Sequence, residues 1–178
     1  MKQLATLLIA VLSYSALATN SPKNIIMIIG DGMGPSYTTA YRMYADDPST
    51  PEVEQTVFDR LLVGMASTHP DIGTGYITDS AAGATALSTG VKTYNGAIGV
   101  DANKRSVQTV LEFAKTKGLK TGIAVTSHIN HATPASFGAH NPSRENYDQI
   151  ADSYFDEKTN GQFVFDVMLG GGWQYFIR

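Results

Sequence analysis

The sequence contains no cysteine, no cluster of basic residues and only one long apolar run near its start. Without cysteine, disulfides and thiol catalysis are excluded, and any metal must be held by oxygen and nitrogen ligands. The formal net charge at pH 7 is −3, with 13 Lys and Arg against 16 Asp and Glu. This balance argues against a nucleic-acid-binding surface, because phosphate backbones attract clustered Lys and Arg. After the first 18 residues, no segment is long and apolar enough to predict a membrane helix, so we expect no membrane span in the mature chain.

The first 18 residues have the pattern of a secretory signal peptide. Lys2 supplies the positive charge, residues 4–12 form a short apolar segment, and residues 16–18 read ALA, which is a cleavage site of the A-x-A type. We therefore expect residues 1–18 to be removed and the protein to be periplasmic or secreted. Residues 19–178 are enough for one domain with a core.

Apolar runs and amphipathic segments alternate along the rest of the chain. Strands are predicted at residues 25–29, 61–68, 123–126 and 163–169, and helices at 35–45, from Ser80, from Ser106 to Gly118, and at 144–155. Residues 90–104 read as a loop with a turn at Asn95 and Gly96. The alternation predicts an α/β fold, a mostly parallel sheet flanked by helices on both faces. Because ligands bind beyond the carboxyl ends of such strands, we expect Asp31 and residues 128–144 to converge on one crevice with Ser80.

Residues 77–85 read ITDSAAGAT, a carboxylate and a hydroxyl followed by small residues. Asp or Ser at a helix N-terminus caps exposed N–H groups. A serine on the first turn also lies at the positive end of the helix dipole, where an alkoxide or a phosphate is stabilised. Taken alone, the pattern favours an ordinary N-cap and leaves a nucleophilic Ser80 as the alternative.

Three familiar motifs do not fit the chain. Residues 30–34 read GDGMG, but Pro35 prevents a dinucleotide-binding reading and the carboxylate would repel a pyrophosphate. Residues 83–93 lack the spacing of a phosphate loop. Thr78 and Ala82 stand where a nucleophile elbow needs glycines. A carboxylate on a glycine turn is better suited to a cation, so Asp31 is a candidate metal ligand or a solvated turn residue.

Further polar residues follow the predicted strand at 123–126. Residues 128–134 read HINHATP, in which His131 and Thr133 alternate and can face the same side. They fit an oxygen-rich metal site or a hydrogen-bonded loop. Arg144 offers a planar fork that matches two phosphate oxygens. The other polar side chains are interpreted as surface groups: His69, His140, and a solvated helix end of Lys115, Lys117 and Lys120.

Taken in order, these pieces resemble the alkaline phosphatase family. Residues 77–85 match its active-site motif position by position, and residues 28–34 look like its first metal-binding strand end. Residues 131–134 are similar to its middle metal segment, and Arg144 falls where its phosphate-binding arginine stands. The resemblance extends through the glycines at 170–172 and covers nearly the whole mature chain.

The resemblance implies hydrolysis of phosphate monoesters through a phosphoserine intermediate. Ser80 would be the nucleophile and a zinc ligand, Asp31 would bridge a zinc and the magnesium, and Thr133 would be a magnesium ligand. Arg144 would clamp two phosphate oxygens and Asp79 would orient it. The implied cofactors are two Zn²⁺ and one Mg²⁺, and the family is commonly dimeric.

His131 stands where some family members carry an aspartate, so it would act on magnesium through water. The family's remaining zinc ligands lie further along than residue 178, and no histidine follows His140. We therefore expect residues 19–178 to be the N-terminal portion of a single phosphatase domain, incomplete at its C-terminus and inactive in isolation. The alternatives are a non-catalytic fragment that binds phosphate or metal, and a phosphodiesterase or sulfatase relative.

Overall fold

The computed structural model describes residues 22–177, so the predicted signal peptide lies outside the described residues. The chain divides into two units between Gly30 and Asp31. Within the described part, no helix has both the length and the apolar character needed to cross a membrane.

Residues 22–30 run in irregular backbone, and the buried strand predicted at residues 25–29 is wrong. Ile25 and Ile28 are about nine-tenths exposed, at 89% and 91%. A buried strand needs neighbours that pair with its backbone and cover its side chains. Among residues 22–177 the only sheet has two strands, which pair with each other and not with this run.

The second unit begins with two exposed helices, α2 (Pro35–Ala45) and α3 (Val57–Leu61). Helix α2 matches its prediction, with proline in the first turn, where its missing N–H costs nothing. Helix α3 was not predicted; Thr56 and Asp59 form a capping box at its start. The strand expected at residues 61–68 is wrong, because Leu61 ends α3 and the chain beyond it makes no ladder.

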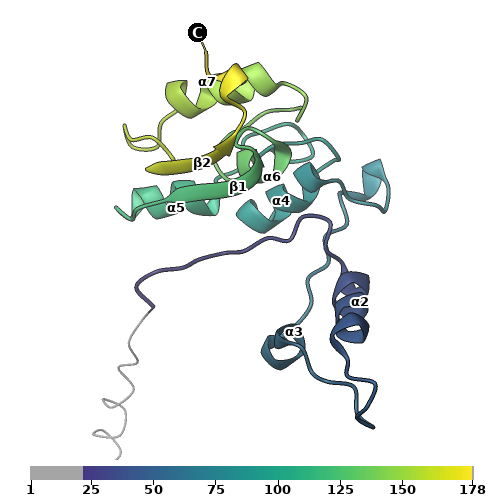
Figure 1. The fold of residues 1–178 in the computed structure, drawn as a ribbon. Helices are drawn as coiled ribbons and strands as arrows, with labels where there is room; N and C mark the ends of the chain where they lie inside the picture. Colours follow the sequence, from purple (N-terminus) through teal and green to yellow (C-terminus); the bar gives the residue numbers. More distant parts are fainter. Residues whose placement is uncertain (1–21, 178) are drawn as a thin grey trace, which may run out of the picture. The chain divides into compact units, whose positions relative to one another are not determined.

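The sheet of the second unit pairs β1 (Gly122–His128) with β2 (Val167–Gly171) in parallel. In Figure 1, α7 (Tyr147–Asp156) lies above this sheet, and α4 (Ser80–Thr89) and α5 (Val110–Thr116) lie below it. Short helices α6 (Ala132–Ala135), η2 (Ile72–Thr74) and η3 (Trp173–Tyr175) complete the described elements. The predicted class, parallel strands joined through helices, is confirmed.

The core joins α4, α6 and α7 through small and apolar side chains. Alanines dominate the contact between α4 and α6, so these two helices can approach closely. Tyr154 of α7 meets Phe165 edge to face, with ring centroids 5.1 Å apart. Gly138 has no room for a side chain, since a Cβ there would lie 2.2 Å from the Phe165 ring.

Two predicted helix starts are wrong by three residues. Helix α5 is capped by Thr109, whereas Ser106 forms an isolated bridge with Val100. Helix α7 starts at Tyr147, because the side chains of Asn141 and Ser143 accept backbone N–H groups and hold a turn before it. The predicted end of α5 is confirmed by Gly118, whose positive φ of 72° closes the helix.

Two residues interpreted as surface groups are largely buried. The Lys115 side chain is 2% exposed and forms an ion pair with Asp166. His140 lies with its ring nitrogens 2.6 Å from the Gly99 carbonyl oxygen and 2.9 Å from a Glu112 oxygen. Both residues are buried against partners more than 25 residues away in sequence, and the local sequence pattern does not reveal such partners.

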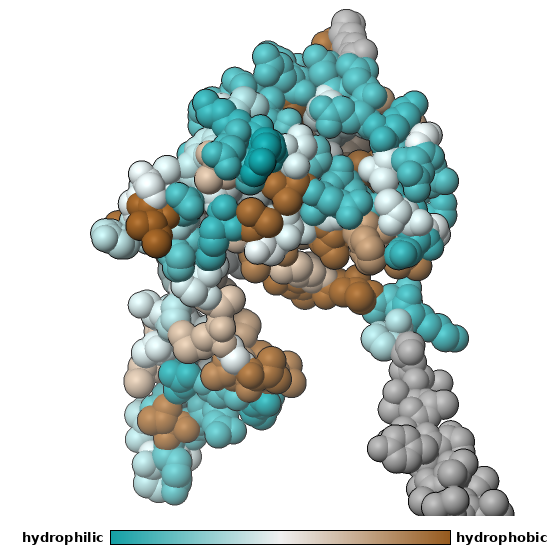
Figure 2. Space-filling view, turned by 180° about the vertical axis from the view of Figure 1, so that it is seen from behind, coloured by the Kyte–Doolittle hydropathy of each residue, from teal (hydrophilic) through white to brown (hydrophobic). Residues whose placement is uncertain are grey.

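Many large apolar side chains of the described residues are exposed. Figure 2 shows brown apolar patches among the teal hydrophilic surface. The largest exposures outside residues 22–30 include Val63, Met65, Tyr76 and Ile77, each above four-fifths.

Candidate active site

Asp31 brings together the two hydroxyl groups that the sequence analysis placed near a metal. One oxygen, Oδ1, accepts a hydrogen bond from Ser80 Oγ at 2.9 Å. The other, Oδ2, accepts one from Thr133 Oγ1 at 2.8 Å. Asp31 follows residue 30 in a tight turn in which Gly32 has a φ of 72°. The predicted convergence of three distant segments is therefore present in the second unit.

Asp79, and not Ser80, caps helix α4. Its Oδ1 accepts the Ala82 N–H at 2.9 Å, which leaves Ser80 as the first residue of the helix. The Ser80 hydroxyl consequently points away from the cap and donates to Asp31. The capping role therefore belongs to Asp79, and the hydroxyl of Ser80 is left to bind Asp31.

Buried hydroxyl groups of helix α4 form hydrogen bonds to neighbouring segments of the core. Thr85 Oγ1 donates to the Ala97 carbonyl at 3.0 Å and accepts the Gly99 N–H at 3.0 Å. Ser88 Oγ donates to the Ser136 carbonyl. These bonds satisfy polar groups in the core, and the bond from Ser88 joins α4 to Ser136 at the end of α6. The helix that begins with Ser80 is thus hydrogen-bonded to two other segments of the core.

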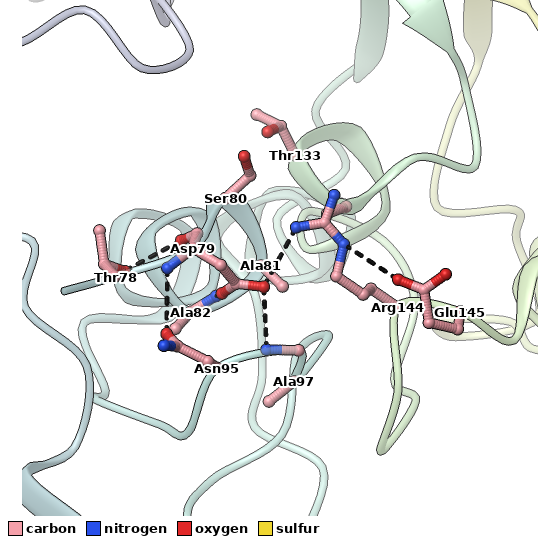
Figure 3. A network of polar contacts seen from close by, with 12 residues as sticks. Thr78, Asp79, Ser80, Ala81, Ala82, Asn95, Ala97, Thr133, Arg144 and Glu145 are labelled. Carbon is pink, nitrogen blue, oxygen red and sulfur yellow. Dashed lines mark hydrogen bonds and ion pairs between the residues drawn. The ribbon is translucent and has the colours of Figure 1, made fainter. Parts of the chain in front are cut away.

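The second oxygen of Asp79 reaches Arg144. Asp79 Oδ2 accepts from Arg144 Nη1 at 3.1 Å and from the Gly96 N–H at 3.0 Å. Figure 3 shows the guanidinium beside Asp79, with Ser80 and Thr133 nearby. The Arg144 side chain is one-fifth exposed, and its Nε lies 3.7 Å from a Glu145 oxygen. A guanidinium is a planar fork whose N–H groups can match two oxygens of a tetrahedral anion.

His131 lies beside the guanidinium. Its Nε2 is 3.4 Å from Arg144 Nη2, and its ring stacks at a tilt near Tyr147 with centroids 6.2 Å apart. Burial, followed by the positive charge of Arg144, lowers the pKa of His131 below its ordinary value. A neutral imidazole adds no repulsion toward the guanidinium.

The oxygen atoms around Asp31 fit part of a magnesium site. A carboxylate and two hydroxyls are hard oxygen donors, which Mg²⁺ prefers together with water. Two zinc ions need more, because a catalytic zinc normally takes three protein ligands. Residues 22–177 contain no group of three or more His, Cys, Asp or Glu side chains placed to hold a metal. Among residues 22–177, the oxygen atoms of Asp31, Ser80 and Thr133 are therefore the donors that fit part of a site for a hard cation.

Sequence reasoning missed the part played by Asn95 and Gly96. They were interpreted only as a turn, yet both contact Asp79 directly. The Asn-Gly pair signalled the turn, but nothing local signalled its neighbours 16 and 17 residues away.

The comparisons with known proteins all match this chain to alkaline phosphatases. Residues 22–178 match the family model described as alkaline phosphatase. The chain is 56% identical over 156 residues to alkaline phosphatase 3 of Bacillus subtilis, covering 88% of this chain and 34% of that protein. It is 40% identical to alkaline phosphatase of Escherichia coli, covering 92% of this chain and 38% of that protein.

Solved structures agree with the sequence matches. A cold-active alkaline phosphatase from a psychrophilic Shewanella has a TM-score of 0.75 and 58% identity, with 84% of this chain and 36% of that chain covered. A histidine-to-aspartate variant of the TAB5 alkaline phosphatase, which has magnesium bound in its M3 site, has a TM-score of 0.71 and 35% identity, with 88% and 41% covered.

The chain spans about a third of the length of the Bacillus and Escherichia relatives it matches. Within that span the match is continuous from residue 22 onward. This chain belongs to the alkaline phosphatase family.

Proposed function

We propose that the complete protein hydrolyses phosphate monoesters through a phosphoserine intermediate on Ser80. The observation that supports the proposal most directly concerns the Ser80 hydroxyl. Because Asp79 caps the helix, this hydroxyl is not used for capping and donates to Asp31 instead. Arg144, held by Asp79, supplies the fork for two phosphate oxygens. A bidentate clamp suits the dianionic terminal phosphate of a monoester.

The chemistry proceeds in two displacements. In the first, Ser80 Oγ loses its proton and forms a bond to phosphorus as the bond to the leaving oxygen breaks, and the leaving oxygen takes up one proton in balance. Arg144 holds two oxygens of the transferring group and compensates their charge. In the second, water attacks the phosphoserine, inorganic phosphate departs, and Ser80 regains its proton.

We propose zinc and magnesium as the cofactors. When bound, these cations lower the pKa of the serine hydroxyl and neutralise charge on the phosphoryl group. Asp31 and Thr133 would hold magnesium, Asp31 and Ser80 would each contribute to zinc, and His131 would act on magnesium through water. We place the other zinc ligands in the part of the family's length that this chain does not cover.

The proposed setting is extracytoplasmic. The predicted signal peptide at residues 1–18 supports export to the periplasm or the medium, and the family resemblance supports a homodimer.

The test compares Ser80→Ala with Ser36→Ala, an exposed serine in the first turn of α2, in the complete metal-loaded protein. We expect Ser80→Ala to lower kcat for p-nitrophenyl phosphate by about 10³-fold or more, since it removes the nucleophile. Acid quenching with labelled phosphate should trap label on Ser80 in the parent and in Ser36→Ala. Near-normal turnover of Ser80→Ala would overturn the assignment. Faster cleavage of a phosphate diester or a sulfate ester by the parent would overturn the substrate class.

A further inference from the structure

A short segment, residues 94–98, touches both halves of the proposed phosphate site. On one side it reaches Asp79, and on the other it reaches the chain that leads into Arg144. The chain here turns at Asn95 and at Gly96, whose φ of 90° favours glycine. The segment is therefore placed to set the separation between the two groups.

The Asn95 side chain binds the backbone that leads into Ser80. Its Oδ1 accepts the Asp79 N–H at 3.0 Å, and its Nδ2 donates to the Ile77 carbonyl at 2.9 Å. One amide thus binds both Ile77 and Asp79, the residue that caps α4, and Figure 3 shows it below Asp79. Donor and acceptor each meet their complement, which fixes the orientation of the amide.

The opposite side of the segment holds the Arg144 backbone. The Gly96 carbonyl accepts the Arg144 N–H at 2.7 Å. Tyr94 Oη donates to the Pro142 carbonyl at 2.8 Å. Ile98 and Asn141 exchange two backbone hydrogen bonds of 2.9 and 2.8 Å.

Asn95 differs from the other members of the segment in its surroundings. Ala97 and Ile98 are fully buried and belong to the packed interior, whereas Asn95 is exposed. Both of its side-chain hydrogen bonds go to the backbone beside Ser80. Removing the amide therefore loosens that backbone without opening a cavity in the core.

We propose that Asn95 is a positioning residue for phosphoryl transfer: its amide holds the backbone on which Asp79 is placed to orient Arg144. The inference rests on the proposed function. Asn95 touches no reacting atom and acts through the Asp79–Arg144 pair. Its loss would let Asp79 drift from the guanidinium and weaken the grip on phosphate.

The experiment measures the inhibition constant of inorganic phosphate, kcat and KM for p-nitrophenyl phosphate, and Tm in the complete metal-loaded protein. The variants are Asn95→Ala, Arg144→Ala and the double variant, with Asn103→Ala as the control at an exposed asparagine in a nearby turn. We expect Asn95→Ala to raise the inhibition constant about tenfold, the worth of one or two hydrogen bonds. In the Arg144→Ala background the same change should have less than about a twofold effect, because the two act as one unit. Asn103→Ala should match the parent in every measurement.

Equal effects of Asn95→Ala with and without Arg144 would overturn the proposal, as would an unchanged inhibition constant. A lower Tm with additive effects would assign Asn95 a purely structural role. Ser80→Ala is measured in parallel. If Ser80→Ala stays active, the proposed function is wrong. If Ser80→Ala is inactive and Asn95→Ala has the inhibition constant of the parent, only the role proposed for Asn95 is wrong.

Discussion

At the scale of single residues, Asp79 shows how one carboxylate serves two neighbours. One oxygen caps α4 and the other binds Arg144 and the Gly96 N–H. Because capping uses the oxygen that faces the helix, the guanidinium is held at the same end of the helix as Ser80. The geometry of the proposed phosphate site therefore depends on the helix cap itself.

Arg144→Lys should weaken phosphate binding although it keeps the charge. Lysine carries a single point charge and cannot hold Asp79 and two phosphate oxygens in one plane. We expect the inhibition constant of inorganic phosphate to rise about tenfold, which corresponds to losing roughly one charge-assisted hydrogen bond. Competitive inhibition of p-nitrophenyl phosphate hydrolysis measures it, with Arg105→Lys as the control on an exposed Arg–Asp pair. An unchanged constant would remove Arg144 from the site.

At the scale of elements, a histidine ties α5 to the chain beyond α6. Both ring nitrogens of His140 face acceptors, the Gly99 carbonyl and Glu112, so the ring must donate from each when the carboxylate is charged. Burial is the largest single influence on the pKa of His140 and lowers it, but the bonds to Glu112 and to the Gly99 carbonyl, together with the charge of Glu112, outweigh burial and leave the pKa raised. Burial is also the largest single influence on the pKa of Glu112 and raises it, but the bonds from His140 and Thr109, together with the charge of His140, outweigh burial and leave the pKa lowered.

These two shifts predict how stability depends on pH. The raised pKa of His140 contributes stability that is complete below 6.5, its ordinary value, and is lost as pH rises through the folded pKa. The lowered pKa of Glu112 contributes stability that is complete above 4.5 and is lost as pH falls through its folded pKa. The pair therefore stabilises the fold most between these two values.

His140→Gln should remove this dependence. We expect the variant to lose about 2 kcal/mol of unfolding free energy at pH 5.5, and less at pH 9, since glutamine keeps hydrogen bonding but carries no charge. Urea unfolding at the two pH values measures the difference. His69→Gln, at an exposed histidine, is the matched control. A loss of the same size at both pH values would contradict the charged-pair explanation.

At the scale of the whole molecule, much apolar surface meets solvent. The residues of the predicted first strand and of the segment after α3 are exposed, including Ile28 at 91% and Val63 at 103%. Large apolar side chains that meet solvent favour association with other apolar surface.

The chain of residues 22–178 on its own should therefore bind an apolar fluorescent dye and associate as its concentration rises. Replacing Ile28 and Val63 together with serine should lower both dye fluorescence and association, because it removes exposed apolar area. Light scattering and dye titration measure the two effects. A control variant with serine at the exposed Glu52 and Asn103 should behave like the parent; equal behaviour of all three would contradict the prediction.

Sequence alone identified the elements whose local signals are strong. The proline start of α2, the small-residue helix after Asp79 and the glycine end of α5 were all visible, because capping and backbone freedom act within a few residues. The buried strand predicted at residues 25–29 is absent, because an apolar run indicates a preference for burial but does not show that a neighbouring strand is there to cover it. The start of α7 was misplaced because side-chain turns compete with helix.

The residue types of the candidate site could be listed from the chain: a carboxylate on a glycine turn, a hydroxyl at a helix start, a threonine after a strand and an arginine. Sequence thus determined the chemistry available and, through motif order, the family. Only the tertiary structure decided which carboxylate caps α4, that Asp31 joins Ser80 to Thr133 across separations of 49 and 102 residues, and that Asn95 braces Asp79. Hydrogen bonds require distances near 3 Å, and the fold alone brings groups so far apart in sequence to that range.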